Sequence, residues 1–323
     1  MIIHGDSVEV LKTLGAESVD ALVTDPPYGL SVTKPRQIAE CLQAWSTGDK
    51  WEPSGRGFMN KSWDAFVPPP ELWREVFRVM KSGAHGLVFA GTRTQDLMSV
   101  SLRLAGFEVR DTLMWVYGSG FPKSHNVALS IDKMQGHPNR GRAIPVASRY
   151  QASDTEEANK LTSNRVEAYE GKSERSQEWA GWGTALKPAY EPVILIRKPL
   201  RGTIAQNVLE NGVGGININA TRIALGEAES TYVEPRAHSG GGRWPANVLF
   251  DSEAAEMLDA QSGGASRFFY TSKASKKERE AGLDGLKKDT SAEITNRKER
   301  SAGLVMKRPN GNDKPNPYAG TSG

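Results

Sequence analysis

The 323-residue sequence predicts an α/β protein in which helices alternate with the strands of one parallel sheet. Two observations predict this class. Apolar runs with the length and composition of strands occur at residues 21–24, 86–90, 107–117 and 192–197. Between them, apolar residues recur at helical spacing, as in residues 72–80 and 97–104. We therefore expect helices on both faces of the sheet.

The first 63 residues are expected to begin with strand, helix and strand. Residues 1–4 are short and apolar, and a helix with Val8, Leu11 and Leu14 on one face ends before Gly15. The strand at residues 21–24 stops at two prolines, which lack the N–H that a ladder needs. The polar stretch at residues 33–63 is expected to be an irregular loop.

Further along, three prolines at residues 68–70 precede a helix that we expect to end near Gly83. A fully apolar strand at residues 86–90 follows it. The next helical pattern runs to Gly106, and residues 107–117 then form another strand.

The chain is expected to divide at Gly118, where its composition changes. Residues 1–117 and 186–200 form the predicted core, residues 118–185 an inserted loop region, and residues 201–323 a second, irregular region with short strands. Residues 151–177 have few large apolar side chains and are expected to form a long loop. Residues 267–314 hold 13 Lys or Arg against 7 Asp or Glu, which fits a basic flexible tail or a surface facing a polyanion.

Composition excludes several classes. The charged fraction is 24% and no long apolar run occurs, so we expect a cytoplasmic protein with no membrane span. Cys41 is the only cysteine, which rules out an intramolecular disulfide and a cysteine-rich zinc cluster. The five histidines are scattered, so no metal site is predicted.

The most informative motif is Asp25-Pro26-Pro27-Tyr28, at the carboxyl end of a strand, where ligands bind in open α/β sheets. The prolines fix the backbone, so the Asp25 carboxylate and the Pro26 carbonyl can accept the two hydrogens of one amino group. The Tyr28 ring can stack on a base taken out of a duplex. Methyl transfer to such an amine needs positioning and electrostatics, not a metal. The alternative is a rigid turn in which Asp25 caps the next segment.

With these residues, the chain resembles the S-adenosylmethionine-dependent DNA amino-methyltransferases. The likeness is to the β-class arrangement, in which the catalytic motif precedes the cofactor motif, and to phage and prophage members. It covers nearly the whole chain, through residues 4–29, 88–94, 111–124, 187–193, 241–250 and 268–279. It implies a Rossmann-like sheet, S-adenosylmethionine as cofactor and double-stranded DNA as partner.

Residue by residue, the resemblance implies that Asp25 and Pro26 hold the amine, that Pro27 fixes the loop and that Tyr28 stacks on the flipped base. It also implies that Asp6 and Asp25 contribute to the cofactor site, Asp6 at the adenine. The alternative for Asp6 is a cap for the helix that follows it.

For DNA contact, the resemblance points to Lys123 and Ser124 in the loop after the strand at residues 107–117. The alternative is that this loop only connects two elements and contacts no DNA. In residues 201–323, the target-recognition region of the family, the candidates are Arg243, Trp244 and Lys273. The alternative for Trp244 is a position in the hydrophobic core.

The family's cofactor turn, of the type Asp-Pro-Phe-x-Gly-x-Gly after a strand, is not found. Residues 316–323 resemble it only superficially, because no apolar strand precedes them. We therefore expect a partial sheet without its first cofactor-binding strands, weak cofactor binding by this chain, and a homodimer or a complementing polypeptide.

The preferred activity is adenine-N6 methylation, because Asp and not Ser opens the tetrapeptide. The alternatives are cytosine-N4 methylation and a non-catalytic DNA-binding remnant. Cytosine-C5 methylation needs a nucleophilic cysteine in a tight loop, whereas Cys41 follows Glu40 in a helix-like context and is interpreted as a small buried residue.

Overall fold

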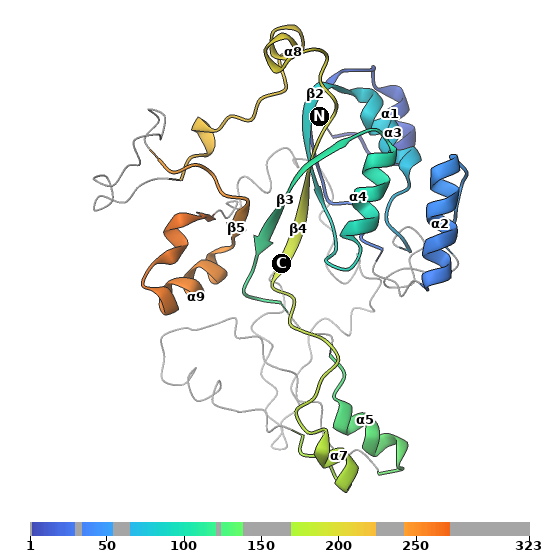
Figure 1. Cartoon of the computed structure of the whole chain (residues 1–323), viewed down its shortest axis with the longest axis vertical. Helices are drawn as coiled ribbons and strands as arrows, with labels where there is room; N and C mark the ends of the chain where they lie inside the picture. Colours follow the sequence, from blue (N-terminus) through green and yellow to red (C-terminus); the bar gives the residue numbers. More distant parts are fainter. Residues whose placement is uncertain are drawn as a thin grey trace, which may run out of the picture. The chain divides into compact units, whose positions relative to one another are not determined.

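A computed structural model describes residues 2–29, 34–53, 65–120, 124–137, 169–223 and 242–271. The unit formed by His4–Lys273 is built on one sheet with the strand order β1-β2-β4-β3-β5-β6 (Figure 1). Its strands are β1 (Val19–Thr24), β2 (Met80–Phe89), β3 (Glu108–Val116), β4 (Tyr190–Arg197), β5 (Val248–Phe250) and β6 (Tyr270–Thr271). The predicted α/β class is confirmed.

The sheet is mixed, so the expectation of a wholly parallel sheet was wrong. β1 and β2 are parallel, as are β3, β5 and β6, but β4 runs antiparallel to both β2 and β3. The chain returns beside the end of β3, where the Tyr117 amide donates to the Ala189 carbonyl at 3.0 Å, and it then runs back along the sheet. The beginning of β4 therefore lies at the edge where β1 and β2 end.

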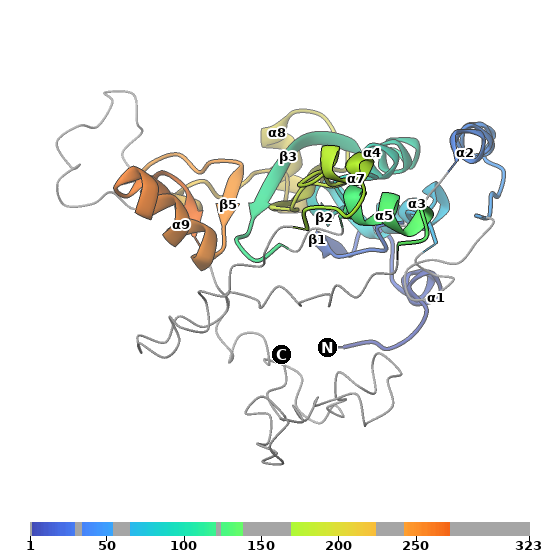
Figure 2. The ribbon, with the colours of Figure 1, turned by 90° about the horizontal axis from the view of Figure 1, so that it is seen from below.

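Eight α-helices occur in the described part of the chain. They are α1 (Ser7–Thr13), α2 (Pro35–Thr47), α3 (Pro70–Val79), α4 (Gln95–Leu104), α5 (Val127–Met134), α7 (Glu174–Glu178), α8 (Ile204–Asn211) and α9 (Ser252–Ser262). Helices α3 and α4 pack against the strands β2, β3 and β4, and α9 packs beside β5 (Figure 2). None of the described helices is long and apolar enough to cross a bilayer.

Several local expectations were wrong. Residues 2–4 form no strand, and the stretch expected to be an irregular loop contains α2. The helix expected to end near Gly83 ends at Val79, because β2 already begins at Met80. Part of the inserted loop region is helical, with α5 and α7 side by side, and the region after residue 200 contains α8 and α9 besides the short strands β5 and β6 that were expected there. The domain boundaries stay a prediction.

The hydrophobic core lies between the sheet and helices α2, α3 and α4. Its largest fully buried apolar side chains include Trp73, Met80, Met98, Leu102, Ile194 and Ile196. Cys41 on α2 belongs to this core, and burial raises the pKa of its thiol to about 12. The thiol therefore stays protonated, and its interpretation as a small buried residue is confirmed.

A buried amide joins α8 to the start of β2. The Asn207 side chain donates to the carbonyls of Ser82 at 2.9 Å and Val213 at 2.8 Å, and it accepts from the Arg201 amide at 3.1 Å. Gly83 beside it has φ +81°, and a Cβ there would lie 2.2 Å from the Asn207 amide nitrogen. The close contact and the left-handed backbone both require glycine at this position.

Candidate active site

The Asp25–Tyr28 loop lies directly after β1, at the sheet edge where ligands were expected. The Asp25 side chain is exposed, whereas Tyr28 is half-buried. The Thr94 hydroxyl, at the start of α4, donates to the Tyr28 carbonyl at 2.6 Å. Gly29 then turns with φ +62°, and a Cβ there would lie 2.7 Å from the Val67 amide nitrogen. Contacts from two other segments thus fix the backbone of the loop.

Glu191, at the beginning of β4, faces this loop. The Tyr28 hydroxyl donates to the Glu191 carboxylate at 3.4 Å, although the two residues are 163 positions apart. Burial raises the pKa of Glu191, and the charge of Asp25 raises it further. Burial also raises the pKa of Tyr28, as do a hydrogen bond with Asp25 and the charge of Glu191. The two carboxylates and the phenol form one electrostatically connected group, which we call the acidic cluster.

Sequence reasoning did not identify Glu191. It lies in the segment 187–193 that carries part of the resemblance, and it directly precedes the proline and apolar run of a predicted strand. An acid at that end of a strand is a candidate site residue once the strand is known to be antiparallel. The sequence pattern does not reveal that direction.

The segment after β3 borders the acidic cluster. Lys187 donates to the Gly118 carbonyl, and a Cβ on Gly120 would lie 1.7 Å from the Pro188 carbonyl oxygen. Burial raises the pKa of Tyr117, and the charge of Glu191 adds to this effect. Residues 117–120 and 187–191 therefore form one side of the site.

Lys123 and Ser124, in the loop after β3, were predicted to contact DNA. Lys123 lies outside the described residues. The Ser124 hydroxyl accepts from the amides of Thr184 at 2.9 Å and Ala185 at 3.3 Å, so it fastens two chain segments together. Its predicted DNA contact stays a prediction.

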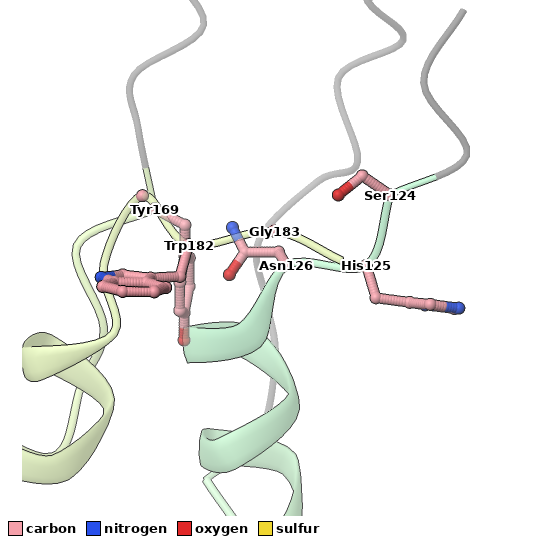
Figure 3. Close-up of a pocket in the computed structure, with 7 residues that line it drawn as sticks. Ser124, His125, Asn126, Tyr169, Trp182 and Gly183 are labelled. Atoms are coloured by element: carbon pink, nitrogen blue, oxygen red, sulfur yellow. The ribbon is translucent and has the colours of Figure 1, made fainter. Parts of the chain in front are cut away.

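A small cavity of about 210 Å³ lies between these segments (Figure 3). It is lined by Ser124, His125, Asn126, Tyr169, Gly181, Trp182 and Gly183. The His125 side chain points to the opposite side from Trp182. The Tyr169 hydroxyl donates to the Asp132 carboxylate at 2.6 Å, which connects this side of the cavity to α5.

Asp6 acts as the N-cap of α1. Its Oδ1 accepts from the amides of Val8 at 3.0 Å and Glu9 at 3.3 Å, as the capping alternative predicted. Both bonds use the same oxygen, and its predicted contact with the cofactor adenine stays a prediction. Among the residues that the structure describes, no three His, Cys, Asp or Glu side chains gather as metal ligands do.

Arginines and aromatic rings are interleaved beside β5 and β6. The Arg222 guanidinium lies 5.5 Å from the centre of the Trp244 ring, and those of Arg243 and Arg267 lie 4.7 and 4.4 Å from that of Phe268. We call these five residues the arginine–aromatic patch. Trp244 is 61% exposed, so its core alternative was wrong.

The patch is held together by backbone contacts. Ile223 and Arg243 form an isolated antiparallel bridge, with backbone bonds of 3.1 and 2.8 Å. The Arg243 guanidinium also donates to the Arg267 carbonyl at 3.2 Å. Lys273, the other candidate in this region, lies outside the described residues.

Two curated proteins are similar to the chain in sequence. The type II methyltransferase M.HindIII of Haemophilus influenzae is 26% identical over 248 residues, which cover 68% of this chain and 65% of that protein. The DNA adenine methyltransferase YhdJ of Escherichia coli is 26% identical over 119 residues, 36% of this chain and 33% of YhdJ. The alignments thus span less than two thirds of either relative.

No protein-family model matches the chain. Among solved structures, TTHA0409 of Thermus thermophilus, titled a putative DNA modification methylase, is 13% identical and covers 85% of this chain and 89% of its own. Its TM-score of 0.30 is too low for a detailed comparison. The sequence matches confirm the resemblance to DNA methyltransferases that the motifs predicted.

Proposed function

We propose that this chain takes part in methyl transfer from S-adenosylmethionine to the exocyclic amine of a flipped base in double-stranded DNA, with adenine-N6 preferred. The observation that carries the proposal is the acidic cluster. An exposed carboxylate directly precedes two prolines, and these lead into a tyrosine whose backbone and hydroxyl are both held. This arrangement suits an amino group attached to a flat ring.

The chain's own groups would act by positioning. Asp25 and the Pro26 carbonyl would accept the two amine hydrogens, which favours a lone pair directed out of the ring plane. Tyr28 would stack on the base and Pro27 would fix the loop. The proton that the amine loses after transfer would pass to Asp25, because a carboxylate is more basic than the Pro26 carbonyl.

The residues present fit the cofactor by charge. S-adenosylmethionine supplies a methyl group on a positively charged sulfur, and the acidic cluster brings two carboxylates together at the same edge of the sheet. Asp25 and Asp6 are the residues that we propose to contact it, Asp6 through its adenine.

The arginine–aromatic patch is the proposed DNA-binding surface, with Arg243 and Trp244 as predicted members. Arginines neutralise phosphates, and exposed rings stack on bases or pack against the sugar. Such binding weakens steeply as salt rises. Lys123, Ser124 and Lys273 remain proposed contacts.

Adenine is preferred over cytosine because Asp begins the tetrapeptide and because YhdJ is named a DNA adenine methyltransferase. Cytosine-N4 methylation is the second candidate, since an Asp–Pro–Pro–Tyr clamp also suits the other exocyclic amine.

The test is incorporation of tritiated methyl groups into unmethylated DNA, followed by digestion and identification of the methylated nucleoside. At a saturating concentration of S-adenosylmethionine, which offsets the weak cofactor binding expected of this chain, we expect N6-methyladenine from the wild type and at least a hundredfold loss in Asp25→Ala, because the amine loses its carboxylate acceptor. Asp49→Ala is the matched control, since Asp49 is exposed at the end of α2 and lies outside the site.

N4-methylcytosine would select the second candidate. DNA binding without any methyl incorporation would favour the non-catalytic remnant. If Asp25→Ala still incorporates methyl groups at the wild-type rate, the Asp25 carboxylate is not needed to hold the amine, and the proposed mechanism is wrong.

A further inference from the structure

We propose that Glu191 is a positioning residue that accepts the hydrogen bond of the Tyr28 hydroxyl and thereby keeps the Asp25 carboxylate available for the amine of the base. This inference rests on the proposed function. It assigns a role to a residue at the beginning of β4, outside the Asp25–Tyr28 loop.

The topology makes this contact possible. Because β4 is antiparallel to β2, its first residues lie beside the carboxyl end of β2, at the sheet edge where β1 leads into the loop. Glu191 pairs with Trp115 in the ladder, and the next residue, Pro192, is buried and accepts from the Ala90 amide at 3.0 Å. Glu191 therefore projects from a rigid backbone.

The opposite partner is equally constrained. The Thr94 hydroxyl donates to the backbone carbonyl of Tyr28 at 2.6 Å, and the Tyr28 hydroxyl donates to Glu191 at 3.4 Å. Because Tyr28 is held both at its backbone and at the end of its side chain, its ring has little freedom to rotate and keeps one orientation for stacking.

The phenol has one proton and two acidic neighbours. Asp25 also forms a hydrogen bond with the Tyr28 hydroxyl, and this bond raises the pKa of the phenol more than the bond with Glu191 does, so the two carboxylates compete for the same donor. When Glu191 takes that hydrogen bond, the oxygens of Asp25 remain available for the hydrogens of the base amine. When Glu191 is absent, the phenol turns to Asp25 and occupies the proposed amine acceptor.

A merely structural role does not explain a carboxylate here. Placing Glu191 in a half-buried position near Asp25 is unfavourable for the charge of Glu191, and a neutral glutamine would accept the same hydrogen bond without this cost. A charged acceptor binds a phenol more strongly than an amide does, which gives the carboxylate an advantage in the competition.

The first experiment tests the contact without DNA or cofactor. Tyrosine labelled with ¹³C at its ζ carbon is incorporated, and the Tyr28 signal is assigned from its loss in Tyr28→Phe. We expect this signal to shift in the acidic range, with a midpoint above the ordinary glutamate value of about 4.3, because the pKa of Glu191 is raised.

Among the described residues, the titratable groups that interact electrostatically with Glu191 are Asp25, Tyr28 and Tyr117. The transition is expected to vanish in Glu191→Gln and to persist in Asp25→Asn. A transition that follows Asp25, or none in the wild type, overturns the inference whatever the enzyme activity.

The second experiment is a double-mutant cycle on methyl transfer. Glu191→Ala is expected to lower kcat by roughly tenfold or more with the KM for DNA changed by less than about twofold, since the DNA-binding surface is intact. Glu191→Gln retains an acceptor that binds the phenol more weakly than a carboxylate does, so its loss of kcat is expected to be smaller than that of Glu191→Ala. Glu210→Gln, an exposed exchange at the end of α8, is the matched control.

The decisive variant is Glu191→Ala combined with Tyr28→Phe. Removing the phenol hydroxyl removes the group that would occupy Asp25, so the double variant is expected to be more active than Glu191→Ala alone. A double variant that is less active than either single variant overturns the inference. A wild type with the ¹³C transition but without methyl transfer refutes the proposed function, and the contact then has no catalytic role.

Discussion

Two regions of the molecule are rich in large aromatic and apolar side chains and use them in opposite ways. In the core beneath the sheet, Trp73 is 1% exposed and packs among apolar neighbours. In the arginine–aromatic patch, Trp244 is 61% exposed and its ring lies against a guanidinium. Aromatic content alone therefore does not separate a core from a binding surface, whereas the nature of the nearest partner does.

The difference extends to how each region is stabilised. The core depends on burial by several helices and four adjoining strands, with side chains distant in sequence packed together. The patch and the adjoining 3-10 turn (Ala265–Phe268) depend on local hydrogen bonds, such as those from the Ser266 amide and hydroxyl to Asp259 at 2.8 and 2.6 Å. Substitutions in the core should change stability, and those in the patch should change binding.

The largest expected effect is in the core. Leu102→Ala is predicted to lower the free energy of unfolding by about 3–5 kcal/mol, because the side chain is fully buried and leaves a cavity. Leu209→Ala, the same exchange at a site that is 87% exposed, is predicted to change it by less than about 0.5 kcal/mol. Urea denaturation followed by circular dichroism measures both, and equal effects would contradict the assignment of the core.

A smaller loss is predicted for Asn207→Ala. The substitution leaves the carbonyls of Ser82 and Val213 without their amide donor and is expected to cost about 1–3 kcal/mol of unfolding free energy. Asn219→Ala, at an exposed position, is the control for the loss of an amide. An unchanged denaturation midpoint in Asn207→Ala would show that α8 is not fastened to β2 by this residue.

In the patch, Phe268→Ala is predicted to leave the unfolding free energy within about 0.5 kcal/mol of the wild type. Its affinity for duplex DNA is expected to fall about tenfold, because the ring that two arginines stack on is lost. Fluorescence anisotropy with labelled duplex at one fixed salt concentration measures this, and Leu209→Ala is expected to bind normally. A loss of stability without a loss of affinity would place Phe268 with the core.

The smallest effect is local and depends on pH. Burial alone would raise the pKa of Asp132, but hydrogen bonds from Tyr169 and from the amides of Lys172 and Ser173 lower it below its ordinary value. These bonds stabilise the contact between α5 and α7 above the ordinary aspartate pKa of about 4, and the contact weakens as pH falls below it.

Hydrogen exchange of the Lys172 and Ser173 amides measures this opening. Protection is expected to fall on acidification from about pH 6 to 3 in the wild type, and to be low at both values in Asp132→Ala. If the core amides of β2 lose protection over the same pH range, the opening is global, and the contact between α5 and α7 does not differ from the core in its sensitivity to pH.

Local patterns predicted the strands and the position of the Asp25–Tyr28 loop, because apolar runs and proline stops are properties of short segments. Helix α2 was missed although Ile38, Cys41, Leu42 and Trp45 have helical spacing after a proline at residue 35, a signal masked by the polar residues around it. The direction of β4 was not predictable, since it depends on the path of residues 117–189. Glu191 was missed for the same reason.

The strand order has a consequence for folding. Of the strands β1, β2, β3 and β4, β4 is synthesised last, yet it lies between β2 and β3. The two inner strands therefore stay unpaired on their facing sides until about 200 residues have been made, and the pairing joins segments distant along the chain. Such late, long-range closure is slow and exposes apolar strand edges during synthesis. A fragment that stops before Tyr190 is thus expected to aggregate.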